Sequence, residues 1–542
     1  TMQAVVPDDG FCHETQREIP VIADVDLVVA GGSSRAVAAA VAAAKTGCKV
    51  YLIGYMPYLG DDICGSFLYD RQKDETPQTA LARKLFEEVK SFRPLHYKTV
   101  LENELIDNNV DFLYSSYVTN LLVDEKGKPA GVVIANRSGR QAIRCKGIID
   151  ATHNASVARM SDIQVKNAGQ GAVEFNYTVV GNGKKESANI THAEVLPLPV
   201  LSGGKEYPVT RYTFLMPLKN DSYAALMEIE QTVRTQTWDP DQVDSSDLLW
   251  YIPQQVITSK KACNEVSGSI RQLPIEAFQA EKYPNLWILG PCAELPRESM
   301  KTVMRPINAV FLGELLGEEI GFRTQLLSMP AQTIVYQKKV NASDYGQIGE
   351  VLQPLRPLLH KNTVNSPAGA LPVLGEYDVV VLGGGTAGAA AGISAARQGV
   401  STLVLEYLHG LGGMGTMGLI GCYWDGFREG FTATIDNGVH EMAPENHPRQ
   451  QKDWKNRAVS DWKMEWYRKE LLKALVRRTR MRRIGREQSG KRACRGNSFR
   501  PGRYPVKSID RQYRKCRYRH CGRSAVRLHR QKDTCRPGSR SR

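Results

Sequence analysis

Three glycines at fixed spacing form the part of this sequence best suited to chemistry. Gly383, Gly385 and Gly388 follow the apolar run YDVVVL and lead into an alanine-rich segment, TAGAAAGISAARQG. We expect Gly383 to permit a tight turn, Gly385 to let the backbone approach a pyrophosphate, and Gly388 to let helix and strand pack closely. Phosphates would then lie at the helix N-terminus, where free N–H groups and the helix dipole favour anions.

An acidic residue completes this pattern. Glu406 ends the next apolar run, LVLE, 18 residues after Gly388, where a carboxylate can accept the ribose hydroxyls of a dinucleotide. Thr386 and Ala387 fill the turn between the last two glycines. Strand, glycine turn, helix, strand and acid together predict a dinucleotide site. The alternative is a glycine-rich strand–helix junction without a ligand.

The same pattern occurs earlier in the chain. Residues 24–60 align without a gap to residues 376–412, at a constant offset of 352. Both copies have the order strand, tight turn, amphipathic helix, glycine, strand, which is a βαβ unit. The sequence therefore predicts two related units in one chain.

The first copy has lost the parts that would hold a ligand. Ser33 and Ala36 replace the second and third glycines of the pattern, and Gly54 replaces its acid. Arg35 adds bulk at the turn, although its guanidinium could meet a phosphate. We expect this copy to keep the fold and to bind a dinucleotide weakly or not at all.

The positive charge is concentrated at one end of the chain. The formal net charge is +14, but residues 477–542 hold 24 of the 71 Lys and Arg residues and three acids. The rest of the chain therefore carries a net charge of −7. The basicity is a property of this tail and does not indicate an acidic partner for the protein body.

The tail has three interpretations. It could be a basic arm that binds nucleic acid, a solvated low-complexity segment, or the product of a shifted reading frame. When the frame over residues 509–525 is moved forward by one nucleotide, the permitted residues include the string IDSTGNADIAIAAGA. This string resembles GIIDATHNASVA at 147–158. We therefore favour a frameshift somewhere after residues 471–476.

The second copy resembles the opening of FAD-dependent oxidoreductases of the glutathione-reductase-like class. It is similar to the flavin-binding part of the heterodisulfide reductases as well. The resemblance includes LEYLHGLGGMGTMGLIG (405–421) and extends to about residue 475. It implies FAD as cofactor, with Gly412 and Gly413 as backbone contacts, unless these glycines only form turns.

A 4Fe–4S cluster is implied only by association with the wider family. Such clusters are bound by closely spaced cysteines. The 11 cysteines of this chain include no such spacing, and no metal ligands are expected.

The first copy resembles a whole domain of this class. IIDATHNASVA (148–158) matches a second strand–turn element, with His153 where the family has glycine. NLWILGPCAELPRES (285–299) and RPINAVFLGELLGEEIG (305–321) resemble the closing strand, turn and helix. Residues 166–280 stand where the family has a β-rich substrate domain.

The implied fold is α/β. We expect a Rossmann-like FAD/NAD(P)-binding three-layer fold with an inserted β-rich substrate domain, followed by a second partial Rossmann unit and an unstructured tail. The predicted segments are an N-terminal extension (1–23), a first, eroded FAD-binding-like domain (24–165 with 281–322), the inserted domain (166–280), a proline-rich linker (323–375), the start of a second FAD-binding domain (376–476) and the tail (477–542).

The function implied by the resemblance is FAD-dependent oxidoreduction, by hydride or electron transfer, of an unknown small molecule. The alternatives are a non-catalytic, truncated flavoprotein fragment and nucleic-acid binding through the arginine-rich tail, which is the least favoured. No catalytic residues can be assigned, because Asp425, His409 and His440 read as surface or structural residues and His153 as a turn residue.

No membrane partner is expected. The sequence contains no apolar run of the ~20 residues that a membrane-spanning helix needs, and its N-terminus lacks the features of a signal peptide. The compartment remains open.

Overall fold

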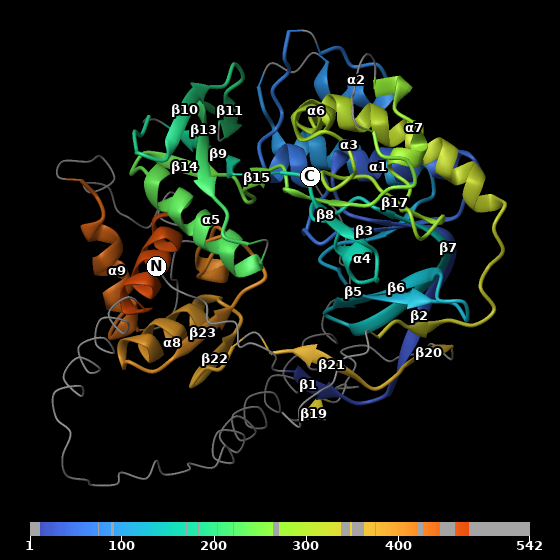
Figure 1. Ribbon diagram of the computed structural model, residues 1–542. Helices are drawn as coiled ribbons and strands as arrows, with labels where there is room; N and C mark the ends of the chain where they lie inside the picture. The colour runs from blue at the N-terminus through green and yellow to red at the C-terminus, as the bar shows by residue number, and fades with distance from the viewer. Residues whose placement is uncertain are drawn as a thin grey trace, which may run out of the picture. The chain divides into compact units, whose positions relative to one another are not determined.

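The computed structural model describes the chain from residue 11 to residue 475 with gaps. It leaves undescribed residues 1–10, 74, 88–90, 170, 182–183, 203, 221, 264–269, 338–346, 349–361, 374, 421–426, 445–460 and 476–542. Residues 1–478 form one compact unit, and its described residues contain both helices and sheets (Figure 1). The α/β class predicted from the sequence is thus confirmed. The predicted tail lies outside the described residues.

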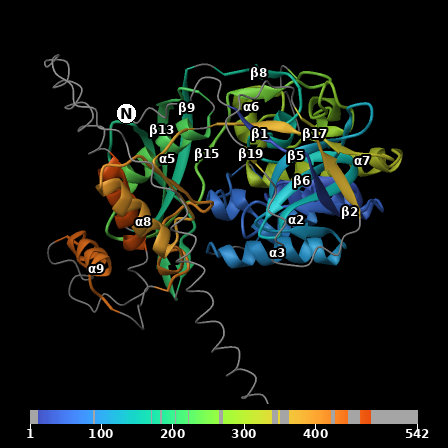
Figure 2. The same ribbon diagram turned by 90° about the horizontal axis from the view of Figure 1, so that it is seen from below.

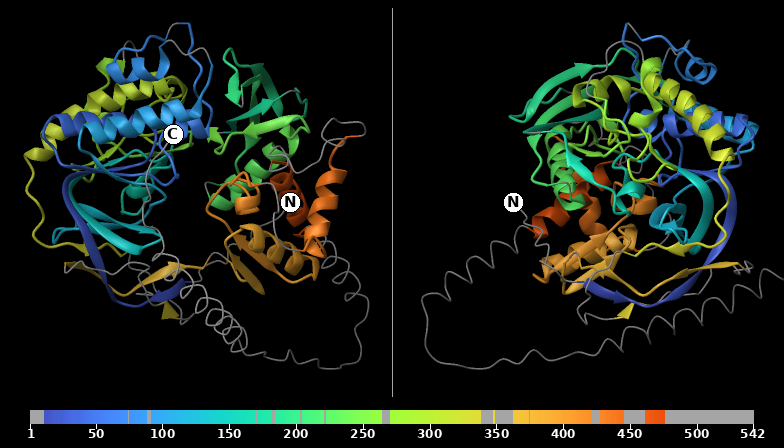
Figure 3. Two further views of the ribbon diagram at one scale, coloured as in Figure 1. Left: turned by 180° about the vertical axis from the view of Figure 1, so that it is seen from behind. Right: turned by 45° about the vertical axis from the view of Figure 1, so that its right-hand side comes forward.

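The first copy is built on a mixed sheet of nine strands. Their order is β17-β7-β6-β5-β18-β20-β2-β3-β4, and β7 also pairs with β2. β2 is long and curves along the sheet (Figure 3). Its apolar run is buried on both faces, as is typical of parallel strands covered on both sides. The strands are β2 (Arg17–Ala30), β3 (Val50–Ile53), β4 (Asp111–Leu113), β5 (Tyr117–Val123), β6 (Pro129–Asn136), β7 (Gly139–Asp150), β17 (Leu286–Ile288), β18 (Ile334–Val335) and β20 (Thr363–Ser366).

Two helices lie side by side along this unit, α1 (Ser34–Lys45) and α7 (Pro306–Gln325) (Figures 1 and 3). Small residues allow their close approach: a Cβ atom added at Gly317 would lie 2.3 Å from the carbonyl oxygen of Ala39. The alanine-rich sequence of α1 thus serves helix packing. The other helices of this unit are α2 (Ala80–Phe86), α3 (Pro94–Asp107), α4 (Ser156–Arg159) and α6 (Arg297–Val303).

Replacing Gly317 by alanine should therefore destabilise the protein. In an open helix this change gains about 1 kcal/mol, but here the new methyl group forces α7 away from α1. We expect a net loss of about 2 kcal/mol in urea denaturation. Glu318→Ala, on the exposed side of α7, is the control and should change stability little; a stabilising effect of Gly317→Ala would contradict the close packing.

The inserted segment forms its own antiparallel sheet and core. β10, β13, β9 and β14 pair in that order, and β15 pairs with β9. Helix α5 (Tyr223–Thr237) contacts β13 (Figure 2), and the apolar side chains between them make a separate cluster. The strands here are β9 (Ala172–Gly181), β10 (Ile190–Val195), β13 (Val209–Pro217), β14 (Gln242–Ser245) and β15 (Trp250–Tyr251), with the small ladders β8 (Val165–Asn167)–β16 (Gln255–Ile257) and β11 (Val200–Ser202)–β12 (Lys205–Tyr207) nearby in the chain.

Two expected boundaries differ from the structure. β2 begins at Arg17, inside the expected extension 1–23. The expected linker 323–375 is not a free connection, because β18 and β20 pair into the nine-stranded sheet. Strands of two and four residues between prolines are too short to show periodicity. A small sheet of β1 (Phe11–Glu14), β19 (Gln347–Ile348) and β21 (Gly369–Pro372) also uses this segment.

The second copy repeats the geometry of the first. β22 (Val379–Leu382) pairs in parallel with β23 (Thr402–Leu405), and α8 (Thr386–Arg397) connects them. Helix bounds and strand register match those of β2, α1 and β3 at the offset of 352. Helix α9 (Phe431–Glu441) and a helix over 461–475 follow. Within the described ranges, no helix is long and apolar enough to span a membrane.

Candidate functional site

Two of the three predicted glycines in the second copy are required by the fold itself. Gly383 has a φ of +88° and donates its N–H to the carbonyl of Leu405 at 2.8 Å. A Cβ atom at Gly388 would lie 1.8 Å from the carbonyl oxygen of Gly383. These positions therefore need glycine whether or not a ligand is present.

Gly385 differs from its neighbours. Its φ of −63° and ψ of −168° are open to any residue, and a Cβ atom there would meet no atom within 4 Å. It is the N-cap of α8, with no side-chain cap bond. Thr386 and Ala387, in the first helical turn, are exposed. The helix begins beside open space, which is the cradle that a phosphate needs.

Glu406 lies against this turn. One carboxylate oxygen accepts the N–H of Gly384 at 2.6 Å, and the other accepts the N–H groups of Tyr407 at 2.8 Å and Leu408 at 3.0 Å. A carboxylate has about four acceptor positions. The backbone thus orients Glu406 and leaves capacity for a ribose hydroxyl.

The loop of Gly412 and Gly413 packs on the same turn. Gly412 donates its N–H to the carbonyl of Gly384 at 2.8 Å and accepts the hydroxyl of Thr386 at 2.9 Å. Both loop glycines have positive φ, +99° and +56°, and a Cβ at Gly413 would lie 3.0 Å from the Cα of Gly385. They do form the turn, and their contact with a cofactor stays a prediction. The structure thus places all eight predicted site residues in one region.

The corresponding turn of the first copy is filled by the protein. Asp62 accepts the backbone N–H of Ser34 at 2.9 Å and its hydroxyl at 2.5 Å. Ser33 caps the N–H of Ala36 at 3.4 Å. A carboxylate therefore lies at the N-terminus of α1, where the phosphates of a dinucleotide would lie.

Arg35 is also committed to internal contacts. It is 5% exposed, and it donates to the carbonyls of Leu289 at 3.0 Å and Ala151 at 3.1 Å. Its Nη1 atom lies 4.0 Å from a carboxylate oxygen of Asp62. The phosphate contact considered for Arg35 is thus replaced by contacts with the protein's own groups.

The sequence carried a signal for this filling that lay just beyond the aligned segments. Asp61 and Asp62 stand where the second copy has Gly413 and Met414. Both acids are buried in a short π-helical turn, Asp61–Gly65. Burial and the neighbouring charge of Asp62 raise the pKa of Asp61.

His153 lies on the inner side of the filled turn. Its ring packs against Tyr251 with centroids 4.8 Å apart, and its Nε2 is shielded from solvent. Burial lowers the pKa of His153 to about 3, and the positive charge of Arg35 adds to this effect. The prediction that His153 has a structural role fits this placement.

Acid should therefore reveal His153. Below pH 6.5 the unfolded chain protonates this imidazole, whereas the folded chain keeps it neutral down to about pH 3. The unfolded state then binds more protons, so stability falls as the pH falls through this window. We expect the wild type to lose roughly 1–2 kcal/mol more than His153→Gln between pH 7 and pH 5, by denaturant titration at both values. Equal losses would show that the imidazole is solvated.

The other residues considered near the loop have no catalytic arrangement. His409 lies 3.3 Å from the carboxylate of Asp247; burial lowers its pKa, and the charge of Asp247 opposes this. His440 is exposed on α9. Asp425 lies outside the described residues.

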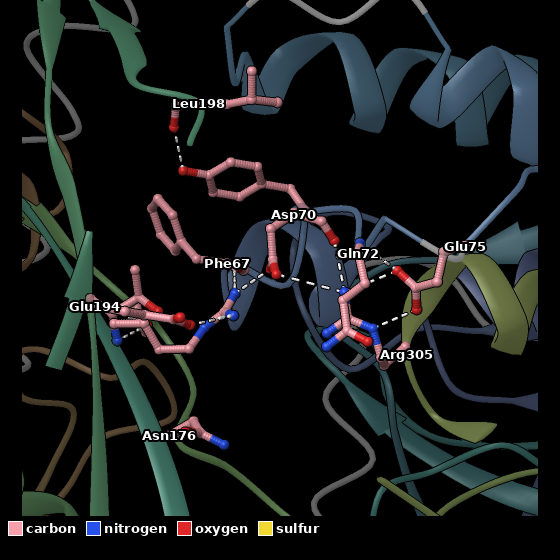
Figure 4. A network of polar contacts seen from close by, with 12 residues as sticks. Phe67, Asp70, Gln72, Glu75, Asn176, Glu194, Leu198 and Arg305 are labelled. Atoms are coloured by element: carbon pink, nitrogen blue, oxygen red, sulfur yellow. Dashed lines mark hydrogen bonds and ion pairs between the residues drawn. The ribbon is translucent and has the colours of Figure 1, made fainter. Parts of the chain in front are cut away.

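A network of ion pairs connects the inserted sheet to the first unit (Figure 4). Arg211 of β13 donates to the carbonyl of Phe67 at 3.2 Å and to the carboxylate of Asp70. Arg305, which precedes α7, donates to the carbonyl of Asp70 at 2.9 Å and to both oxygens of Glu75. Burial alone would raise the pKa of Asp70, but the two guanidiniums lower it. This carboxylate is paired, and the network braces the two parts of the fold.

A model of the family described as FAD dependent oxidoreductase matches residues 26–261 and 378–485, well over half of the chain. No curated protein matches the sequence. Among solved structures, CabE, an aromatic hydroxylase from angucycline biosynthesis, is 14% identical over 55% of this chain and 63% of its own, with a TM-score of 0.33. The chain thus spans less than two thirds of that protein.

Two further structures have a similar degree of likeness. A geranylgeranyl bacteriochlorophyll reductase-like protein from Thermoplasma acidophilum is 14% identical over 56% of this chain and 79% of its own, with a TM-score of 0.35. The flavin-dependent brominase Bmp2 is 12% identical over 57% and 81%, with a TM-score of 0.34. The family match decides the assignment: this chain belongs to the FAD-dependent oxidoreductases.

Proposed function

We propose that the second glycine turn binds the ADP part of FAD, that the first turn holds no dinucleotide, and that the chain acts as an oxidoreductase on a small molecule. The observation that carries this proposal is the open space beside Gly385. The fold does not require glycine there, whereas a pyrophosphate that approaches the backbone does.

Three groups of the second copy have separate tasks in this proposal. The N-terminus of α8 would hold the pyrophosphate through its N–H groups and dipole. Glu406, oriented by three backbone N–H groups, would accept ribose hydroxyls. Gly412 and Gly413 keep the following loop close to the turn. When bound, FAD supplies hydride or electron transfer, and the protein supplies its position and electrostatic surroundings.

The test is whether the purified full chain carries FAD. We expect protein that shows flavin absorption in the visible range after incubation with FAD and gel filtration. Protein that stays colourless after such reconstitution would contradict the proposal.

A colourless protein would favour the second candidate, a non-catalytic flavoprotein fragment. A specific observation supports this candidate: Leu382, at the end of β22, is 80% exposed, so the second unit has an uncovered apolar face. The nucleic-acid alternative depends on residues 477–542, which lie outside the described residues.

A further inference from the structure

The second unit exposes an apolar sheet face that is buried in the first. On β22, Val380 is 49% exposed and Leu382 80%, and Leu405 of β23 is 48% exposed. The residues 352 positions earlier are each exposed by 2% or less: Val28, Ala30 and Ile53. Because the two units share their register, the difference lies in what covers the strands.

One edge of β22 is open as well. In the described part of the chain, β22 and β23 pair only with each other. Val379 and Gly383 donate their N–H groups towards the β23 side, to Ser401 and Leu405. Since N–H direction alternates along a strand, the N–H groups of Val380 and Leu382 point to the open edge, which is a template for another strand.

The first unit shows which strand occupies this edge. β2 lies between β3 and β7, and β7 pairs with it in parallel, Val28 opposite Ile148 and Ala30 opposite Asp150. Asp150 ends the strand and accepts the N–H groups of Thr152 at 3.1 Å and Ala158 at 2.9 Å. The covering element is therefore an apolar strand that ends in an aspartate-capped turn.

We propose that the open edge of β22 binds a parallel strand of the β7 type, placed opposite Val380 and Leu382, and that the shifted reading frame downstream of Val476 encodes it. The string IDSTGNADIAIAAGA, which that frame permits over 509–525, begins with the same Ile-Asp pair that ends β7 and continues with a similar turn. Strand addition of this kind gains main-chain hydrogen bonds along the edge and buries the apolar face.

Amide hydrogen exchange tests this proposal without reference to FAD. The chain as printed is compared with the product of a gene that lacks one nucleotide after the codon of Val476. Exchange at Val380 and Leu382 should slow by about tenfold or more in the shifted product. Their counterparts Val28 and Ala30, already covered by β7, are internal controls and should not change.

A synthetic peptide with the sequence of residues 139–158, added to the chain as printed, keeps the test valid if the shifted product does not fold. It should slow exchange at the same two amides, and a scrambled peptide should not. Unchanged exchange in both arms would overturn the proposal. Protection that instead rises with the concentration of the unmodified chain would also overturn it, because a second copy would then be the occupant.

Discussion

Replacing Gly385 by serine leaves the second unit folded but lowers its affinity for FAD by about tenfold or more. A Cβ atom at this position meets no protein atom, the backbone angles suit any residue, and serine is a preferred N-cap. The new side chain therefore costs the fold nothing and occupies only the space that the pyrophosphate needs. Fluorescence titration with FAD and a thermal melt, on the same samples, measure the two effects.

The first copy supplies the matched control for this variant. Ser33 already stands at the equivalent position, and Ser33→Gly should leave FAD binding unchanged because Asp62 still fills that turn. Unaltered FAD affinity in Gly385→Ser would show that no ligand approaches this backbone. A large fall in melting temperature would show that the fold itself needs glycine there.

Replacing Asp62 by alanine should destabilise the first unit by about 3–5 kcal/mol. The change leaves the N–H and hydroxyl of Ser34 without their acceptor and the buried Arg35 without its nearby carboxylate. An added anion can take the vacated place at the helix N-terminus. Phosphate should therefore raise the melting temperature of Asp62→Ala more than that of the wild type, at equal ionic strength in chloride.

An exposed ion pair provides the comparison for this effect. Asp24 forms a two-bond pair with Arg144 on the surface, and exposed pairs of this kind are worth up to about 1 kcal/mol. Asp24→Ala should cost that much and show no response to phosphate. If Asp62→Ala behaves in the same way, Asp62 does not serve as the internal anion of α1.

The repeat, the turn and the acid could be predicted from the sequence because their physical requirements are local. Gly383 needs a positive φ and Gly388 a close contact within five residues. Glu406 ends the adjacent parallel strand, so the βαβ order alone places it beside the turn. The strand register then follows from the helix length that both copies share.

The filling of the first turn could not be predicted in the same way. Asp62 reaches Ser34 from 28 residues away, through a π-helical turn without a recognisable pattern. Arg35 contacts carbonyl groups more than 100 residues away, so that its direction is a result of tertiary packing. Substitutions in the glycine pattern indicated a loss of binding, but only the structure shows what replaced the ligand.

The most direct test of one open and one filled turn is the number of FAD molecules that the full chain binds. Calorimetric titration should give one FAD per chain for the wild type, and this binding should disappear in Gly385→Ser. Two FAD molecules per chain, or one that still binds after Gly385→Ser, would contradict the assignment of the two turns.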